Sequence, residues 1–180
     1  MYNNKRKIDI LEIKVMSIDL MLYETIKDSG IDLILSLPCI MLKGLLQLIE
    51  EKNEIQHIPV TREEEGVGIA AGAYLGGKTP AILMQNSGLG NSVNAIKSLL
   101  QLFKIPVIFI MSHRGAEGEK IVAQIPMGQL TPDLLDLLKM EKFIIDSKDN
   151  INYLQTAVEL SISSEMPTCI LLKKTLWGLL

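Results

Sequence analysis

The sequence predicts an α/β fold, a doubly wound and mainly parallel sheet with helices on both faces. Short, continuous apolar runs such as residues 80–84 are typical of strands buried on both faces, as in parallel sheets. Segments with apolar residues at helical spacing alternate with these runs along the chain. In such sheets, ligands bind beyond the carboxyl ends of the strands, so the loops that follow the strands are the places to search for function.

The first half of the chain alternates helices and strands. Ser17 is a suitable N-cap for a first helix, and Gly30 fits a left-handed stop after that helix. Pro38 ends the first strand, and the helix before residue 80 is rich in glycine and alanine. The pattern predicts strands over residues 33–37, 57–60 and 80–84, with helices over residues 41–49 and 66–77 between them.

The second half continues the alternation. A helix over residues 89–103 leads to a strand over residues 106–111. Thr131 and Pro132 are suited to the cap and first turn of the next helix. The remaining pattern predicts a strand over residues 143–145, a helix over residues 151–162 and a strand over residues 168–172.

The composition limits the classes of protein to which this chain can belong. The chain has 180 residues, and we expect residues 16–180 to form one domain, with residues 1–15 as an appendage. A formal net charge of -3 gives no reason to expect nucleic acid as a partner. The apolar run at residues 105–111 is far shorter than the roughly 20 residues that span a membrane. Two cysteines, without a CxxC pair or a signal-peptide core, indicate a cytoplasmic setting.

Three adjacent carboxylates, Glu63, Glu64 and Glu65, follow the second predicted strand. Acidic side chains are favoured in a first helical turn by roughly 0.3 to 1 kcal/mol each, so helix stabilisation alone can account for them. A carboxylate that comes directly after a strand also lies at the ligand crevice of this fold. The run therefore allows either a helix start or a functional acid.

The loop after the third strand carries amide and hydroxyl groups on Gln85, Asn86 and Ser87, followed by Gly88. The spacing of its glycines satisfies neither nucleotide-binding fingerprint. We expect a close-packed turn that directs polar groups toward a ligand.

The connection after the fourth strand, residues 112–128, is rich in glycine and longer than packing requires. Its basic side chains, His113, Arg114 and Lys120, are candidates to bind an anionic substrate. The alternative is a solvated loop in which these groups pair with Glu117 and Glu119.

Two further side chains have less specific patterns. His57 lies on a predicted strand, where a structural role is expected. Cys39 follows the first strand, with no recognisable base beside it in the sequence, and fits a small core residue better than a nucleophile.

Taken together, residues 17–172 resemble the pyrimidine-binding domains of thiamine-diphosphate enzymes. In that family a proline turn ends the first strand, as at residues 37–39, and a glutamate precedes a glycine of an Ala-x-Gly segment by nine residues. Counting back from Gly72 selects Glu63, whereas a fit to Tyr74 selects Glu64. Residues 71–73 read Ala-Gly-Ala and depart from the common Asp-Gly-Tyr pattern. The resemblance implies that one of these glutamates activates the cofactor.

Within the family, residues 60–66, 84–91, 112–115 and 123–128 are similar to the alpha subunits of sulfopyruvate decarboxylases. The resemblance implies conversion of 3-sulfopyruvate to sulfoacetaldehyde and carbon dioxide, in coenzyme M biosynthesis. Phosphonopyruvate decarboxylases share the segment 84–91, so phosphonopyruvate or another 2-oxo acid is the near alternative. A non-catalytic binding or regulatory subunit with the same fold is the alternative of another class.

The resemblance also implies site residues and partners. Glu63 is the expected activating carboxylate, with Glu64 as the alternative. The family's Gly-Asp-Gly motif is absent from this sequence. A separate beta subunit is therefore expected to hold Mg²⁺ and the cofactor's diphosphate, in a hetero-oligomer with the active site at the subunit interface. The expected cofactor contacts are Glu63, Gln85, Asn86, Ser87 and Gly88, and the expected substrate contacts are Cys39, Gln85, Asn86, His113, Arg114 and Gln124.

Overall fold

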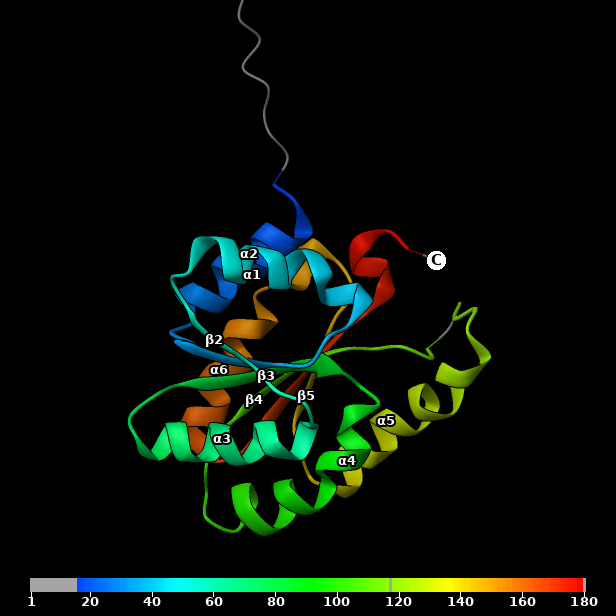
Figure 1. Ribbon diagram of the computed structural model, residues 1–180. Helices are drawn as coiled ribbons and strands as arrows, with labels where there is room; N and C mark the ends of the chain where they lie inside the picture. The colour runs from blue at the N-terminus through cyan, green and yellow to red at the C-terminus, as the bar shows by residue number, and fades with distance from the viewer. Residues whose placement is uncertain (1–15, 117, 180) are drawn as a thin grey trace, which may run out of the picture.

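The computed structural model describes residues 16–116 and 118–179, which form a six-stranded parallel sheet covered by helices (Figure 1). The strand order is β2-β1-β3-β4-β6-β5, and each neighbouring pair is parallel. The predicted fold class is confirmed. The appendage expected at residues 1–15 lies outside the described residues. The strands are β1 (Leu33–Ser36), β2 (Gln56–Pro59), β3 (Pro80–Gln85), β4 (Ile108–Ser112), β5 (Lys142–Ile145) and β6 (Thr168–Leu172).

Six α-helices cover the two faces of the sheet in the described part of the chain. One face is covered by α1 (Ile18–Asp28), α2 (Lys43–Lys52) and α6 (Tyr153–Ser164). The other is covered by α3 (Glu63–Leu75), α4 (Gly88–Ala95) and α5 (Ile125–Leu137). Helix α4 continues as a π-helix, η2 (Ile96–Gln101). The short 3₁₀ turns are η1 (Ile40–Leu42), η3 (Val122–Gln124), η4 (Lys148–Asn150) and η5 (Lys174–Trp177).

The alternation of side chains along the central strands divides the core into two layers. Ile34, Leu83 and Ile110 pack toward α1, α2 and α6, whereas the neighbouring Leu35, Ile82 and Phe109 pack toward the other helices. All six side chains are fully buried. Each central strand is therefore apolar on both faces, which explains why continuous apolar runs identified the strands in the sequence.

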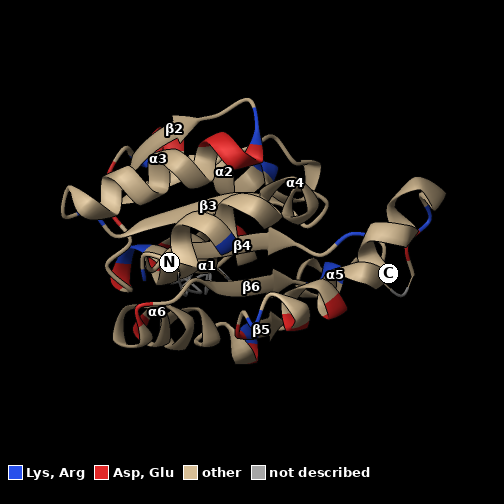
Figure 2. Cartoon of the chain, turned by 90° about the horizontal axis from the view of Figure 1, so that it is seen from below, with Lys and Arg blue, Asp and Glu red and all other residues tan. Residues whose placement is uncertain are grey.

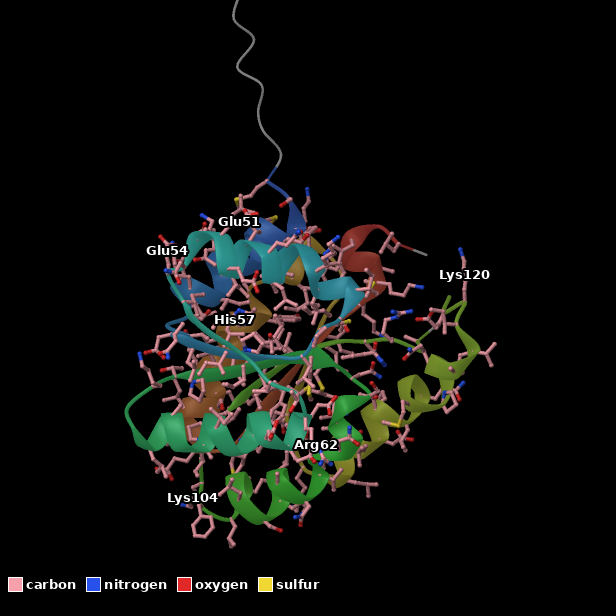
Figure 3. The ribbon with its side chains drawn as sticks, in the orientation of Figure 1. Glu51, Glu54, His57, Arg62, Lys104 and Lys120 are labelled. Atoms are coloured by element: carbon pink, nitrogen blue, oxygen red, sulfur yellow. The ribbon has the colours of Figure 1, made fainter. Side chains whose placement is uncertain are left out.

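The polar loops lie beside a reversal in the strand order. The chain leaves β1 for the edge strand β2, and leaves β3 in the opposite direction for β4. Such a reversal opens a crevice beyond the carboxyl ends of the strands. In Figure 3, Arg62 and Lys120 lie toward this end of the sheet, and Glu54 lies toward the other end. Within the described ranges, no helix is long and apolar enough to cross a membrane.

Helix α5 begins earlier than the sequence pattern predicted. Pro126 lies in its first turn, so Thr131 and Pro132 are interior positions and the prediction that they start the helix is wrong. A proline inside a helix leaves the carbonyl four residues earlier without its usual donor. That carbonyl belongs to Gly128, and the Nε2 atom of His113 lies 2.9 Å from its oxygen. The imidazole replaces the missing N–H, and the irregular connection after β4 is shorter than expected.

Candidate active site

The three carboxylates at the start of α3 differ in what they contact. Figure 2 shows the acidic start of α3 in red. Glu64 forms an ion pair with Arg62 at 2.8 Å, and both side chains are solvent-accessible. Glu65 accepts a hydrogen bond from the Thr61 hydroxyl at 2.7 Å. Both of these carboxylates contact neighbouring residues at the exposed start of α3. Such contacts fit acidic side chains that stabilise the first turn of a helix.

Glu63 instead faces the start of α4. Its Oε2 atom accepts a hydrogen bond from Nδ2 of Asn91 at 2.9 Å. The rest of the carboxyl group lies over Gly88, where an added Cβ would be 2.4 Å from Cγ and 2.7 Å from Oε1 of Glu63. Only glycine leaves room for the acid in this position. The N-terminus of α4 also provides a favourable field for a negative charge.

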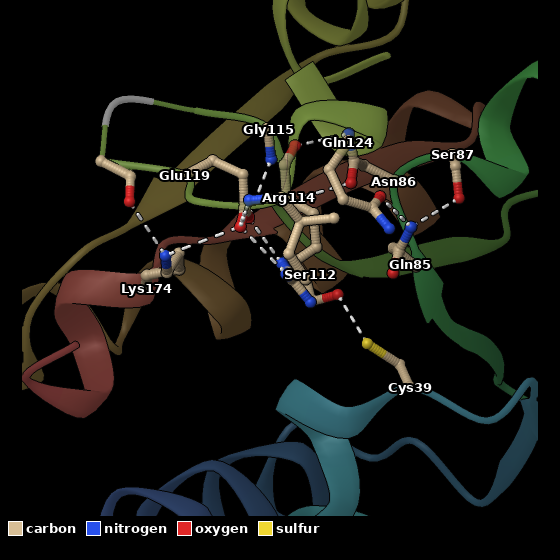
Figure 4. A network of polar contacts seen from close by, with 12 residues as sticks. Cys39, Gln85, Asn86, Ser87, Ser112, Arg114, Gly115, Glu119, Gln124 and Lys174 are labelled. Carbon is tan, nitrogen blue, oxygen red and sulfur yellow. Dashed lines mark hydrogen bonds and ion pairs between the residues drawn. The ribbon is translucent and has the colours of Figure 1, made fainter. Parts of the chain in front are cut away.

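Three polar side chains meet at the end of β3 (Figure 4). The Nε2 atom of Gln85, the last residue of β3, donates to the Ser87 hydroxyl and to Oε1 of Gln124, both at 2.8 Å. All three side chains are half-buried. Hydrogen bonds therefore fix these three side chains, and their partial exposure leaves them accessible to a ligand. Ser87 directly precedes Gly88, which contacts the side chain of Glu63, so the three polar side chains lie close to that glutamate.

Asn86, by contrast, uses its side chain inside the protein, where it is 1% exposed. Its Oδ1 accepts from the backbone N–H of Arg114 at 2.9 Å, and its Nδ2 donates to Oγ1 of Thr131 at 2.8 Å. A further contact joins Nδ2 to the Arg114 carbonyl at 3.2 Å. The amide links the end of β3 to the connection after β4 and to α5. The predicted ligand contact of Asn86 stays a prediction.

Arg114 is paired with Glu119, and the two side chains are only 8% and 2% exposed. Nε donates to Oε2 at 2.8 Å and Nη2 donates to Oε1 at 3.1 Å. The same carboxylate accepts from the backbone N–H groups of Gly115 and Ile121. The guanidinium, aided by these N–H groups, holds the pKa of the Glu119 carboxyl well below its usual range.

This pairing matches the alternative in which the basic groups of the loop are neutralised by its own acids. The charge of Arg114 is already compensated by Glu119, and its proposed substrate contact stays untested. Lys120 is exposed. Glu117 lies outside the described residues.

His113 is 4% exposed, and only one of its two imidazole nitrogens has a hydrogen-bond partner among the described residues. The Gly128 carbonyl can only accept, so Nε2 carries the hydrogen and Nδ1 is a bare acceptor. Nδ1 has no hydrogen-bond partner among the described residues. Burial, followed by the nearby positive charge of Lys173, lowers the pKa of His113 despite the bond to Gly128. The ring is therefore held in its neutral form.

Cys39 and His57 have the packing expected of structural residues. Cys39 is buried, and its sulfur lies 3.1 Å from the Ser112 hydroxyl, at the ends of β1 and β4. His57 Nε2 lies 2.7 Å from the Ser36 hydroxyl across the β1–β2 pair. The proposed substrate contact of Cys39 is not tested by these contacts.

The structure thus brings Glu63, Gly88, Ser87, Gln85 and Gln124 to one end of the sheet. Two residues in this region were not singled out from the sequence. Asn91 follows Gly88 by three residues on α4, so a helical periodicity would have placed it on the same face. Glu119 was noted only as a possible partner of a basic group. Among the described residues, no group of three or more His, Cys, Asp or Glu side chains is placed to hold a metal ion.

Comparisons with known proteins identify the family. Residues 16–140 match the family model of the thiamine pyrophosphate enzyme, N-terminal TPP binding domain. The chain is 52% identical over 156 residues to the sulfopyruvate decarboxylase subunit alpha of Methanococcus maripaludis, covering 86% of this chain and 93% of the relative. The chain belongs to the sulfopyruvate decarboxylase alpha-subunit family of thiamine pyrophosphate enzymes. The predicted resemblance is confirmed.

Other members of this enzyme family are longer. A sulfopyruvate decarboxylase of Methanosarcina acetivorans is 38% identical, over 86% of this chain but 39% of its own length. A phosphonopyruvate decarboxylase of Streptomyces viridochromogenes is 38% identical over 79% of this chain and 37% of its own length. A solved structure of a thiamin diphosphate-dependent enzyme from Mycobacterium smegmatis supports the fold alone. Its TM-score is 0.69 at 15% identity, covering 88% of this chain and 31% of that one.

Proposed function

We propose that this chain is the cofactor-activating subunit of a thiamine-diphosphate-dependent decarboxylase. The reaction is the conversion of 3-sulfopyruvate to sulfoacetaldehyde and carbon dioxide, a step of coenzyme M biosynthesis. The observation that carries the proposal is the carboxylate of Glu63, held over Gly88 at the start of α4 by Asn91. The 52% identity to a named sulfopyruvate decarboxylase alpha subunit supports the choice of substrate.

The residues present fit the chemistry of the cofactor's aminopyrimidine. When bound, thiamine diphosphate supplies the electron sink that allows a 2-oxo acid to lose carbon dioxide. Glu63 would bind a pyrimidine ring nitrogen through a charge-assisted hydrogen bond and hold a proton there. Because the carboxylate is half-buried and Asn91 orients it, little reorganisation is needed when this contact forms. Glu64 is a weaker candidate, since Arg62 already neutralises its charge.

The remaining groups at the strand ends would bind and orient the ligands. Gln85, Ser87 and Gln124 offer half-buried amide and hydroxyl groups, which suit the oxygens of a small anionic 2-oxo acid. Gly88, the remaining expected cofactor contact, provides the space in which the Glu63 side chain lies. The substrate contacts of Cys39, Asn86, His113 and Arg114 remain part of the proposal, although Asn86 and Arg114 already have partners within the protein.

The active enzyme would be a hetero-oligomer. The relative from Methanococcus maripaludis is named subunit alpha, and the chain spans 39% of the longer Methanosarcina relative. The rest of that longer chain has room for the diphosphate-binding domain. We therefore propose that a beta subunit binds the diphosphate and Mg²⁺, and that the active site lies between the two subunits.

The direct test is to reconstitute the complex and measure turnover. The chain is mixed with a beta subunit, Mg²⁺ and thiamine diphosphate, and carbon dioxide release from sulfopyruvate is followed. Glu63→Gln should lower kcat by at least about 100-fold, as expected when a positioned proton-transfer group is lost. Glu64→Gln, on the same helical turn, should retain activity within a few-fold. Full activity of Glu63→Gln would overturn the assignment.

Two other functions give different results in the same assay. Faster turnover of phosphonopyruvate than of sulfopyruvate would favour the near alternative, which the relative from Streptomyces viridochromogenes supports. A non-catalytic subunit would fail to bind thiamine diphosphate with every candidate beta subunit present.

A further inference from the structure

We infer that Asn91 is a positioning residue, which fixes the carboxylate of Glu63 for the cofactor. This inference rests on the proposed function of Glu63 and adds a second residue to that site. Asn91 lies one helical turn after Gly88 on α4, whereas Glu63 begins α3, so the contact joins the two helices. The Asn91 amide donates to Oε2 of Glu63 at 2.9 Å.

The contact fixes one oxygen of the carboxylate and leaves the other for a ligand. A glutamate side chain has three rotatable bonds, and fixing it in one orientation costs rotamer freedom. The bond from Asn91 and the contact with Gly88 select one orientation before any ligand arrives. Oε1, which lies over Gly88, takes no part in the bond to Asn91. The carboxylate of Glu63 would therefore already have its binding orientation when the cofactor arrives.

Helix formation does not explain an asparagine at this position. Asparagine is less favourable than alanine in a helix interior, because its side chain competes for backbone hydrogen bonds. Asn91 is exposed, so it adds nothing to the core. Asn94 on the next turn of α4 is also exposed and accepts a hydrogen bond from Ser98 on its own helix. Asn94 therefore provides a matched control for substitutions at Asn91.

The decisive substitution is Asn91→Asp, which keeps the shape but replaces the donor by a second carboxylate. Two carboxylates in contact cannot both be ionised without repulsion, so protonation of the pair is favoured. In the reconstituted complex, the affinity for thiamine diphosphate is measured by calorimetry as a function of pH. The acidic limb of this profile should move to higher pH by about one pH unit. Asn94→Asp adds the same charge to the same helix and should leave the profile unchanged.

A neutral substitution separates orientation from charge. Asn91→Leu removes the donor, and should weaken thiamine diphosphate binding and lower kcat/KM by roughly 10-fold each, the effect of losing one hydrogen bond to a charged group. The near-ultraviolet circular dichroism of the bound aminopyrimidine should change in Asn91→Leu and not in Asn94→Leu. A purely structural role for Asn91 would alter thermal stability without moving the pH profile or this spectrum.

The results distinguish failure of this inference from failure of the proposed function. If the wild-type complex binds cofactor and loses activity in Glu63→Gln, but Asn91→Asp matches Asn94→Asp in its pH profile, the role of Asn91 alone is overturned. If the wild-type complex does not bind thiamine diphosphate, or if Glu63→Gln behaves like wild type, the proposed function fails and the inference falls with it.

Discussion

The guanidinium of Arg114 and the carboxylate of Glu119 form two parallel hydrogen bonds within the connection between β4 and η3. Oε2 of Glu119 also accepts from Gly115, and Oε1 accepts from Ile121. The pair therefore fixes both ends of the segment that leads to Gln124. A buried ion pair therefore anchors the segment that precedes Gln124, whose amide contacts Gln85.

Removing one partner of this pair should be strongly destabilising. Glu119→Gln would leave the Arg114 guanidinium buried without a counter-charge, and should lower the free energy of unfolding by about 3 kcal/mol. Urea denaturation of the purified chain measures this change. The matched control is Glu165→Gln, because Glu165 forms an exposed pair with Lys104 at 3.4 Å. The control should change stability by less than about 1 kcal/mol, and equal effects at both sites would contradict the assigned role.

His113 should make the protein less stable in mild acid. Burial lowers the pKa of this imidazole, so as pH falls below its ordinary value of 6.5 the unfolded chain binds a proton that the folded chain does not. The stabilisation is present above that pH and is lost progressively below it. The chain contains only two histidines, and burial also lowers the pKa of His57.

The measurement therefore uses His57→Gln as the background, in which His113 alone titrates as a histidine. The free energy of unfolding, measured between about pH 8 and pH 5.5, should fall with decreasing pH. Adding His113→Gln should flatten the curve, because glutamine still donates an N–H but binds no proton. An unchanged slope would show that carboxylates cause the effect.

Gly115 should not tolerate a side chain. Its φ is +76°, and an added Cβ would lie 1.9 Å from the Gln124 carbonyl oxygen and 2.8 Å from Cα of Gly128. Gly115→Ala should cost more than about 2 kcal/mol of stability, because strain and overlap add. Gly72→Ala is the control, since Gly72 is exposed in α3 with open space beside it. The control should gain roughly 0.5 to 1 kcal/mol by thermal or urea denaturation.

Gln124 should affect substrate handling more than folding. Its half-buried amide meets Gln85 at the crevice, so Gln124→Leu should lower kcat/KM for sulfopyruvate by roughly 10-fold or more with little change in melting temperature. Steady-state kinetics of the reconstituted complex provide the measurement. Gln155 is an exposed amide on α6, bonded to Glu159, and Gln155→Leu should leave the kinetics unchanged. Similar losses in both variants would argue against a site role for Gln124.

The fold was predictable because local patterns agreed with the tertiary structure. Ser17 caps α1 as expected, its hydroxyl accepting from the Leu20 N–H at 3.2 Å, and Gly30 adopts a left-handed φ of +82°. The strand at Thr168–Leu172 has the predicted bounds. The start of α5 was predicted wrongly because Pro132 looks like a first-turn residue. Its tolerance inside the helix depends on His113, a side chain from another element.

The candidate site was predictable only in part. The sequence placed an acid after the second strand, but the choice between Glu63 and Glu64 depended on spacing to Gly72 or Tyr74. Their different contacts arise from the position of α4, which no local pattern specifies. In the same way, neither sequence spacing nor composition establishes that Glu119, rather than an anionic substrate, neutralises Arg114.

The contact between Glu63 and Gly88 has a consequence for how this family can diverge. Because any Cβ at position 88 would overlap the side chain of Glu63, we expect substitutions at the two positions to be coupled. A lineage that abandons the acid would release position 88 to other amino acids, whereas a lineage that keeps the acid would keep the glycine. An amino acid other than glycine at position 88 would therefore identify alpha subunits that have lost the activating carboxylate but retain the fold.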